Sequence, residues 1–126
     1  MTYHYGTISK GRLQTCHPGI VRVFDEAIRH RDVAILCGYR ARGSQNKAFR
    51  EGKSGLKWPQ SKHNSLPSRA VDAGPYPLDW DDTDALMEFS GWVLGLADAL
   101  GVPLESGAFW TTPFDPTHFQ LTERKD

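Results

Sequence analysis

Two histidines and one aspartate could bring three metal-binding groups to a single point. His63 lies in a polar loop, Asp72 ends the short segment Ala-Val-Asp, and His118 begins the segment His-Phe-Gln-Leu near the end of the chain. Catalytic zinc commonly takes three protein ligands, drawn from imidazole and carboxylate groups, and keeps a fourth position for water. Spacing alone leaves a second interpretation open, because an isolated histidine is more often exposed or hydrogen-bonded than bound to a metal.

The first half of the chain contains signals for elements that could position these groups. Apolar residues recur with helical spacing and predict an amphipathic helix over Pro18–His30, with proline in its first turn. The β-branched run Val33–Cys37, closed by Gly38, predicts a buried strand. A short helix over residues 44–51 and a long polar loop over residues 53–68 follow.

The second half mixes strands with one long helix. Residues 70–72 predict a strand that is stopped by Gly74, Pro75 and Pro77. An acidic run precedes the next helix, whose N-terminus it should stabilise, and the helix ends at Gly101 and Pro103. Residues 104–121 should hold one or two short strands, including 118–121. Helices and strands mix without regular βαβ alternation, so we expect the α+β class.

Length and composition are those of one ordinary globular domain spanning residues 1–126. Two cysteines, Cys16 and Cys37, are too few for a disulfide framework and lack paired metal-ligand spacing, so we expect free thiols. The first 13 residues contain no apolar run, which predicts that no secretory signal is present and that the protein is made in the cytoplasm. No stretch is long enough to span a membrane.

Charge is unevenly distributed although the net charge is zero. Residues 1–69 hold 13 Lys and Arg against 4 Asp and Glu, whereas residues 70–126 hold 2 against 11. Either the two halves pack together and compensate, or a basic face approaches an anionic polymer. No basic recognition helix and no aromatic stacking strand accompany the charge, so we expect no nucleic-acid partner.

The histidine segments belong to an ordered series of motifs. Ser61-x-His63 is followed by Ala70-x-Asp72, and the series ends with an acidic residue that lies three residues before His118. Upstream of Ser61 stand a Gly-Tyr-Arg segment, a Gln and a Gly-Lys-Ser segment. From about residue 9 to residue 121 the chain resembles the zinc peptidases that share the fold of the VanX and VanY enzymes, the Hedgehog signalling domain and the phage L-alanyl-D-glutamate endolysins. Eight residues separate His63 from Asp72, which resembles the phage members rather than the carboxypeptidases.

This resemblance implies a small antiparallel sheet flanked by helices, and one Zn²⁺ per chain held by His63, Asp72 and His118. It implies that Asp115 is the catalytic base, although the same aspartate could instead cap a turn before Pro116. The remaining implied roles concern the substrate. They are oxyanion stabilisation by Arg40 and substrate binding by Ser61, which could equally only shape the loop. Trp110 could also line the substrate cleft, although packing is the commoner role of such a residue.

The segment 107–110 departs from the resemblance. It reads Gly-Ala-Phe-Trp where the family often has Gly-Gly-Asp-Trp, which leaves no aspartate there to take a role.

The implied function is hydrolysis of peptidoglycan stem peptides by a monomer that acts on the cell wall after release. We expect an endolysin-type cut between L-Ala and D-Glu. Two alternatives are a D-alanyl-D-alanine carboxypeptidase or dipeptidase, and a non-catalytic zinc-stabilised binding module. Asp115 and Arg40 argue against the binding module, because a purely structural zinc needs neither.

Overall fold

Four antiparallel strands form one sheet in the order β1-β2-β4-β3. The computed structural model describes residues 2–122, so Met1 and residues 123–126 of the predicted single domain lie outside the described residues. The strands are β1 (Val33–Cys37), β2 (Ala70–Pro75), β3 (Leu104–Ser106) and β4 (His118–Leu121). Helices and an antiparallel sheet thus coexist as the predicted α+β class requires.

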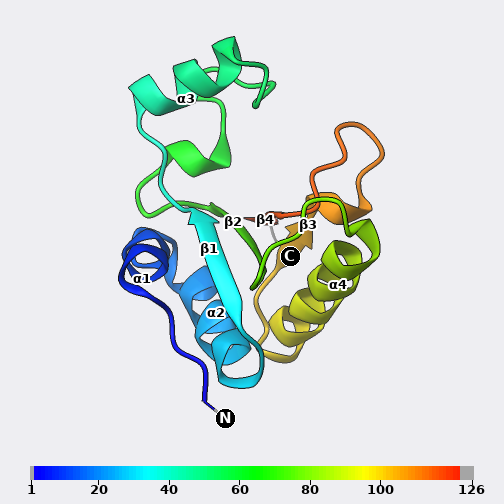
Figure 1. The fold of residues 1–126 in the computed structure, drawn as a ribbon. Helices are drawn as coiled ribbons and strands as arrows, with labels where there is room; N and C mark the ends of the chain where they lie inside the picture. Colours follow the sequence, from blue (N-terminus) through cyan, green and yellow to red (C-terminus); the bar gives the residue numbers. More distant parts are fainter. Residues whose placement is uncertain (1, 123–126) are drawn as a thin grey trace.

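Four helices and two short 3₁₀ turns surround the sheet. Their bounds are α1 Thr7–Leu13, α2 Pro18–His30, α3 Arg42–Arg50, η1 Lys62–Asn64, α4 Thr83–Ala99 and η2 Gly107–Phe109. Helices α2 and α4 cover one face of the sheet, below it in Figure 1, while α3 and the loop before β4 stand on the other side. Within residues 2–122, no helix is both long and apolar enough to cross a membrane.

The core lies between the sheet and helices α2 and α4. The ring of Phe119 on β4 contacts Phe24 of α2 and Phe89 of α4 edge-on, with centroids 5.6 and 6.4 Å apart. Because side chains alternate along a strand, burying Val71 and Phe119 against the helices turns the side chain of each next residue to the opposite face. We call that opposite side the open face of the sheet.

Helix α2 and strand β1 have the predicted bounds, and α3 begins two residues earlier than predicted. In the acidic run, Asp82 caps α4 by accepting a hydrogen bond from the Ala85 amide (3.1 Å). Both cysteines are free thiols, as expected.

Strand β2 is longer than predicted. The prediction that Gly74 and Pro75 stop it is wrong, because the strand continues to Pro75. The Ala73 amide donates to the carbonyl of Thr117 (2.9 Å), so the backbone nitrogen of Pro75, two residues on, also points toward β4. Pairing with β4 stops at Asp72, so the missing N–H of Pro75 removes no ladder hydrogen bond.

Helix α1 was not predicted, because its seven residues contain Gly11 and bury little besides Leu13. It covers the outer edge of β1, where Ser9 accepts a hydrogen bond from the Ile35 amide (3.1 Å) and Arg12 donates to the Ile35 carbonyl (3.1 Å). Side chains of α1 thereby satisfy backbone groups that an edge strand would otherwise leave unpaired.

Candidate active site

A single cross-strand row on the open face brings together residues from three strands. Asp72 of β2 stands opposite His118 of β4 and opposite Cys37 of β1. The register of β1 shifts between Ile35 and Cys37, and such a bulge re-aims the following side chain. Since Ile35 is in the core, the bulge is what places Cys37 in the same row as Asp72.

His63 joins this row from the short turn η1 and completes a group that could hold a metal ion. The ligand atoms of His63, Asp72 and His118 all lie within 4.8 Å of one another. Asp72 Oδ1 is 3.4 Å from His63 Nε2 and 3.2 Å from His118 Nδ1. The structure therefore gathers the three residues that the sequence predicted as ligands.

The ring of His63 is oriented by a backbone carbonyl. Its Nδ1 lies 2.8 Å from the oxygen of Gly38, which can only accept, so Nδ1 carries the proton. Its Nε2 is therefore an acceptor, and it is buried without a hydrogen-bond partner in the described part of the chain. An unpartnered lone pair on a side chain only 2% exposed is aimed at the point shared with Asp72.

His118 is oriented in the same way by a side-chain relay. Its Nε2 lies 2.9 Å from Gln120 Oε1, while the amide nitrogen of Gln120 donates to Glu105 Oε1 (2.5 Å). The Gln120 oxygen is thus the acceptor, so Nε2 of His118 carries the proton and Nδ1 presents a lone pair. Two imidazole lone pairs and the Asp72 carboxylate then face one another, and three acceptors repel unless a cation lies among them. This donor set fits a divalent metal ion.

Electrostatics at this point favour positive charge. Burial raises the pKa of the Asp72 carboxyl, but the neighbouring His118 and His63 side chains outweigh burial and hold the pKa well below its usual range. Burial lowers the pKa of His63, yet the neighbouring Asp72 and Cys37 side chains together raise it to about 10. A bound metal would take the place of the proton that this environment favours on His63.

Gly38 shows why the segment after β1 has its sequence. A Cβ at this position would overlap the carbonyl oxygen of Arg12 and the hydroxyl of Thr15 at the end of α1. Only glycine lets the backbone approach α1 so closely, and the carbonyl of Gly38 then reaches His63. The amide of Arg40 also donates to the carbonyl of His63 (2.8 Å), so the two loops are joined twice.

The guanidinium of Arg40 points to the same site. Its Nη2 lies 3.6 Å from Asp72 Oδ2, and its Nη1 donates to Gln45 Oε1 (3.1 Å). Gln45 is fully buried in α3, and its Oε1 also accepts from Asn64 Nδ2 (3.1 Å). Sequence reasoning assigned no role to Gln45 or Asn64. Their contacts with Arg40 and with each other join separate segments of the chain, so they become evident only from the structure.

The backbone of Asp115 is fixed next to His118, one of the three residues His63, Asp72 and His118 that we call the metal group. Its amide donates to the carbonyl of Gly107 (3.0 Å), and its own carbonyl accepts from the amide of His118 (3.2 Å). A Cβ on Gly107 would overlap the carbonyl of Asp115 and lie 2.9 Å from its Cβ. Gly107 is thus the residue that allows this close approach.

The carboxyl of Asp115 senses the other charged groups of the site. Burial raises its pKa, and the negative charge of Asp72 adds to this effect, while His118, His63 and Arg40 lower it. The net result is a raised pKa. A raised pKa is one of the properties that a general base requires.

Ser61 contacts the segment that carries His63, and Trp110 contacts His118. The Ser61 hydroxyl accepts from the amide of His63 (3.2 Å), while the Ser61 amide donates to Asn64 Oδ1 (3.0 Å), which is the capping box of η1. The ring of Trp110 lies 5.4 Å from that of His118, tilted by 48°. Ser61 therefore shapes the loop that carries His63, and Trp110 forms an aromatic wall beside His118.

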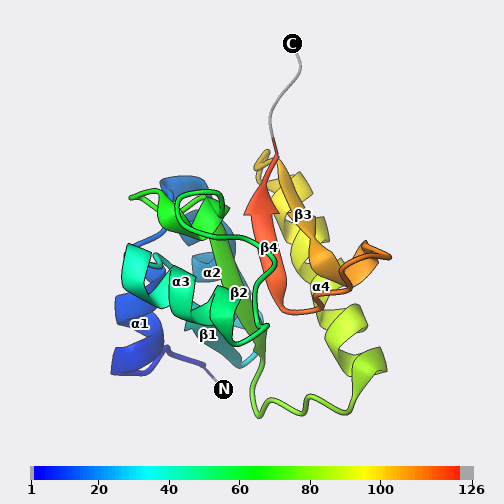
Figure 2. The ribbon, with the colours of Figure 1, turned by 90° about the horizontal axis from the view of Figure 1, so that it is seen from above.

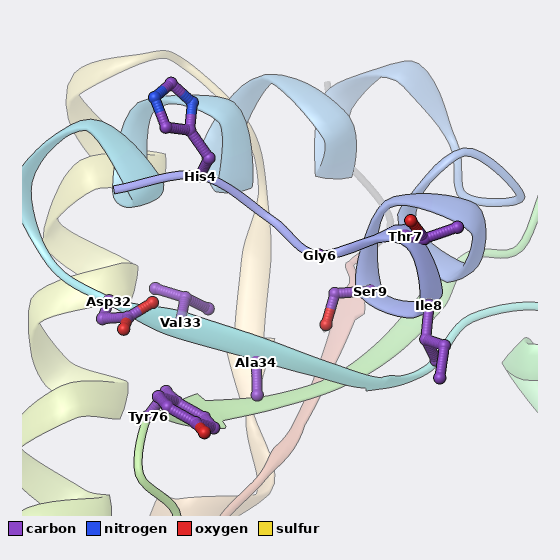
Figure 3. A pocket seen from close by; sticks show the side chains of 9 residues that line it. All are labelled: His4, Gly6, Thr7, Ile8, Ser9, Asp32, Val33, Ala34 and Tyr76. Atoms are coloured by element: carbon purple, nitrogen blue, oxygen red, sulfur yellow. The ribbon is translucent and has the colours of Figure 1, made fainter. Parts of the chain in front are cut away.

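Two surface hollows flank the sheet, and the larger does not include the metal group. It measures about 510 Å³ and lies at the other end of β1, where Figure 3 shows Asp32, Val33 and Ala34 along the strand and Tyr76 beside them. The second, of about 380 Å³, adjoins the loop of His63 and is lined by Ser61, Lys62, Asn64 and Arg69 among others. Ser61 lines the second hollow, whereas His63, Asp72 and His118 line neither of the two.

Known proteins share this architecture and these motifs. Among solved structures, the Serratia marcescens L-Ala D-Glu endopeptidase ChiX superposes with a TM-score of 0.79 at 30% sequence identity, covering 94% of this chain and 89% of that one. No curated protein sequence matches the chain. Residues 1–120 match the family described as phage L-alanyl-D-glutamate peptidase. The predicted resemblance is thereby confirmed: the chain belongs to the phage L-alanyl-D-glutamate peptidase family, and it is an endopeptidase that acts on peptidoglycan.

Proposed function

We propose that the chain is a zinc-dependent endopeptidase that cuts the bond between L-alanine and D-glutamate in peptidoglycan stem peptides. The metal assignment rests on three acceptor atoms that face one another, His63 Nε2, His118 Nδ1 and Asp72 Oδ1. The protonated nitrogen of each ring faces away from this point, toward Gly38 in one case and Gln120 in the other. The bond assignment is supported by the family and by the similarity to the Serratia L-Ala D-Glu endopeptidase. Two imidazoles and one carboxylate are a typical ligand set of catalytic zinc.

The roles of the surrounding residues follow from their positions. A zinc ion bound here would supply Lewis acidity toward the scissile carbonyl and lower the pKa of a water molecule. The Asp115 carboxylate accepts a proton from the attacking water and passes it to the nitrogen of the leaving D-glutamate. Arg40, held by Gln45, directs N–H groups toward the oxyanion that develops on the carbonyl. Trp110 and Ser61 contact the peptide on either side.

Replacing His118 with alanine is expected to abolish zinc binding, because two remaining ligands cannot hold the ion against dialysis. His30→Ala serves as the control, since His30 is exposed on α2 and its ring pairs with Glu26, away from the site. Elemental analysis of both variants after dialysis measures zinc per chain. One zinc per chain in His118→Ala would remove this ligand assignment.

Asp115→Ala should retain zinc and yet lose turnover by roughly 10²–10⁴-fold, the usual contribution of a general base. Asp81→Ala, at an exposed position before α4, is the matched control and should behave as wild type. Hydrolysis of purified cell wall and metal content are measured on the same preparations. Activity within about twofold of wild type in Asp115→Ala would place the base elsewhere.

Arg40→Lys should reduce turnover by roughly 10²-fold although the charge is kept, because an ammonium group cannot reproduce the planar fork that reaches Gln45 and the site. Arg42→Lys, two residues later on the exposed surface, controls for the chemical change itself. Steady-state rates of the two variants are compared on a soluble stem peptide. Equal rates for the two variants would show that Arg40 has no catalytic role.

Digested peptidoglycan should contain stems with a new amino-terminal D-glutamate and L-alanine left on the muramic acid. Mass spectrometry of the soluble and insoluble products distinguishes this from a terminal cut. Release of free D-alanine from otherwise intact stems would contradict the proposed bond and support the carboxypeptidase alternative.

A further inference from the structure

Five exposed cations occupy one short segment beside the site. Residues 42–57, which comprise α3 and the loop that follows it, form what we call the cationic lobe. The lobe contains a single acid, Glu51. Its cations are Arg42, Lys47, Arg50, Lys53 and Lys57, all with exposed side chains.

No ion pair joins the cationic lobe to the rest of the protein within residues 2–122. Of the two interpretations of the uneven charge, compensation by packing would require ion pairs between the halves of the chain. Within residues 2–122, the ion pairs of this kind that involve Lys or Arg are Arg31 with Glu88 and Arg40 with Asp72, both outside the lobe.

Inside the lobe, the contacts of the cations are local or missing. Lys53 pairs only with its neighbour Glu51, at 3.3 Å. Lys57 lies over the ring of Phe49, 4.9 Å from its centroid, which leaves its charge exposed. The other three cations, Arg42, Lys47 and Arg50, make no ion pair or side-chain hydrogen bond in the described part of the chain. Their charge is therefore available to a partner.

The lobe is rigidly joined to the site at both ends. The chain enters it from Arg40 and leaves it toward His63, and Gln45 ties its two arms together. Gln45 Oε1 accepts a hydrogen bond from Arg40 Nη1, and Gln45 Nε2 donates one to the carbonyl of Leu56 (2.6 Å). Figures 1 and 2 show α3 and its loop on the open-face side of the sheet, next to β1 and β2. A polymer held on the lobe would thus pass beside the metal group.

We infer that the cationic lobe is a docking surface for the carboxylates of peptidoglycan stems next to the one being cut. This inference rests on the proposed function. Every stem contains a glutamate, and one of its two carboxyl groups stays free when the other is in the peptide chain. The substrate polymer is therefore a repeating array of anions. A fixed group of cations raises the local concentration of such a polymer and lets successive stems reach the same site.

The test compares two triple variants with equal charge changes. Arg42→Gln/Lys47→Gln/Arg50→Gln removes the three lobe cations that have no partner. Lys10→Gln/Arg22→Gln/Arg29→Gln removes three exposed cations from α1 and α2. Binding is measured by co-sedimentation with purified sacculi freed of teichoic acid, on ice, at low and high ionic strength. Turnover is measured separately on a soluble stem peptide.

At low ionic strength the lobe variant should bind sacculi roughly tenfold more weakly than wild type, since three exposed charge contacts are lost. The control variant should bind as wild type does, and high salt should remove the difference. Both should keep wild-type turnover on the soluble peptide. Wild type should bind sacculi whose carboxyl groups have been chemically amidated as weakly as the lobe variant binds unmodified sacculi.

Equal binding by the two triple variants would overturn the inference. Binding that requires retained teichoic acid would also overturn it, because the anion would then be a phosphate. If wild type binds sacculi through the lobe but does not cut the L-Ala–D-Glu bond, the proposed function fails while the docking surface stands.

Discussion

A carboxylate on a central strand must be compensated by groups that the strand itself cannot provide, and Asp72 imposes this constraint on the whole site. Its side chain is only 20% exposed, so water cannot solvate it fully. Isolated burial of such a charge would be strongly unfavourable. The guanidinium of Arg40, from the segment after β1, lies near it. Two imidazoles, from η1 and β4, direct lone pairs to the same point, where a cation would compensate all three groups. The long loop is ordered around this charge, and the metal group is the result.

The sheet supplies the geometry that makes this compensation possible. Strict alternation buries Phe119 and leaves its neighbour His118 on the open face, while the bulge in β1 brings Cys37 into line with Asp72. The outer nitrogens of the histidines are then fixed by unequal means, a backbone carbonyl for His63 and a glutamine–glutamate relay for His118. Such outer contacts set the tautomer and direction of a ligand as firmly as the ligand's own backbone does.

Periodicity predicted α2 and β1, because each depends on local sequence, and the motif series predicted that His63, Asp72 and His118 come together. Helix α1 could not be predicted in this way, since its stability comes from covering an edge strand more than 20 residues away in the chain. The end of β2 was predicted wrongly, because the sequence does not tell whether the side of the strand that the nitrogen of Pro75 faces has a paired neighbour. The contacts of Gln45 and the close approach of Gly107 to Asp115 are tertiary relations that no single segment encodes. The high density of Lys and Arg in the cationic lobe was visible in the sequence, but the lack of ion-pair partners for Arg42, Lys47 and Arg50 within the described residues was not.

The loop from Trp110 to Asp115 is anchored on both sides and unconstrained between them. At one end the amides of Trp110 and Asp115 share the carbonyl of Gly107, and at the other Ser90 holds the carbonyl of Pro116 (2.9 Å). The tip includes Phe114, which is 46% exposed. Residues 111–114 can therefore change in length or composition without displacing the carboxylate beside them, and evolution or an engineer could alter which wall chemistry the enzyme accepts while leaving its reaction intact.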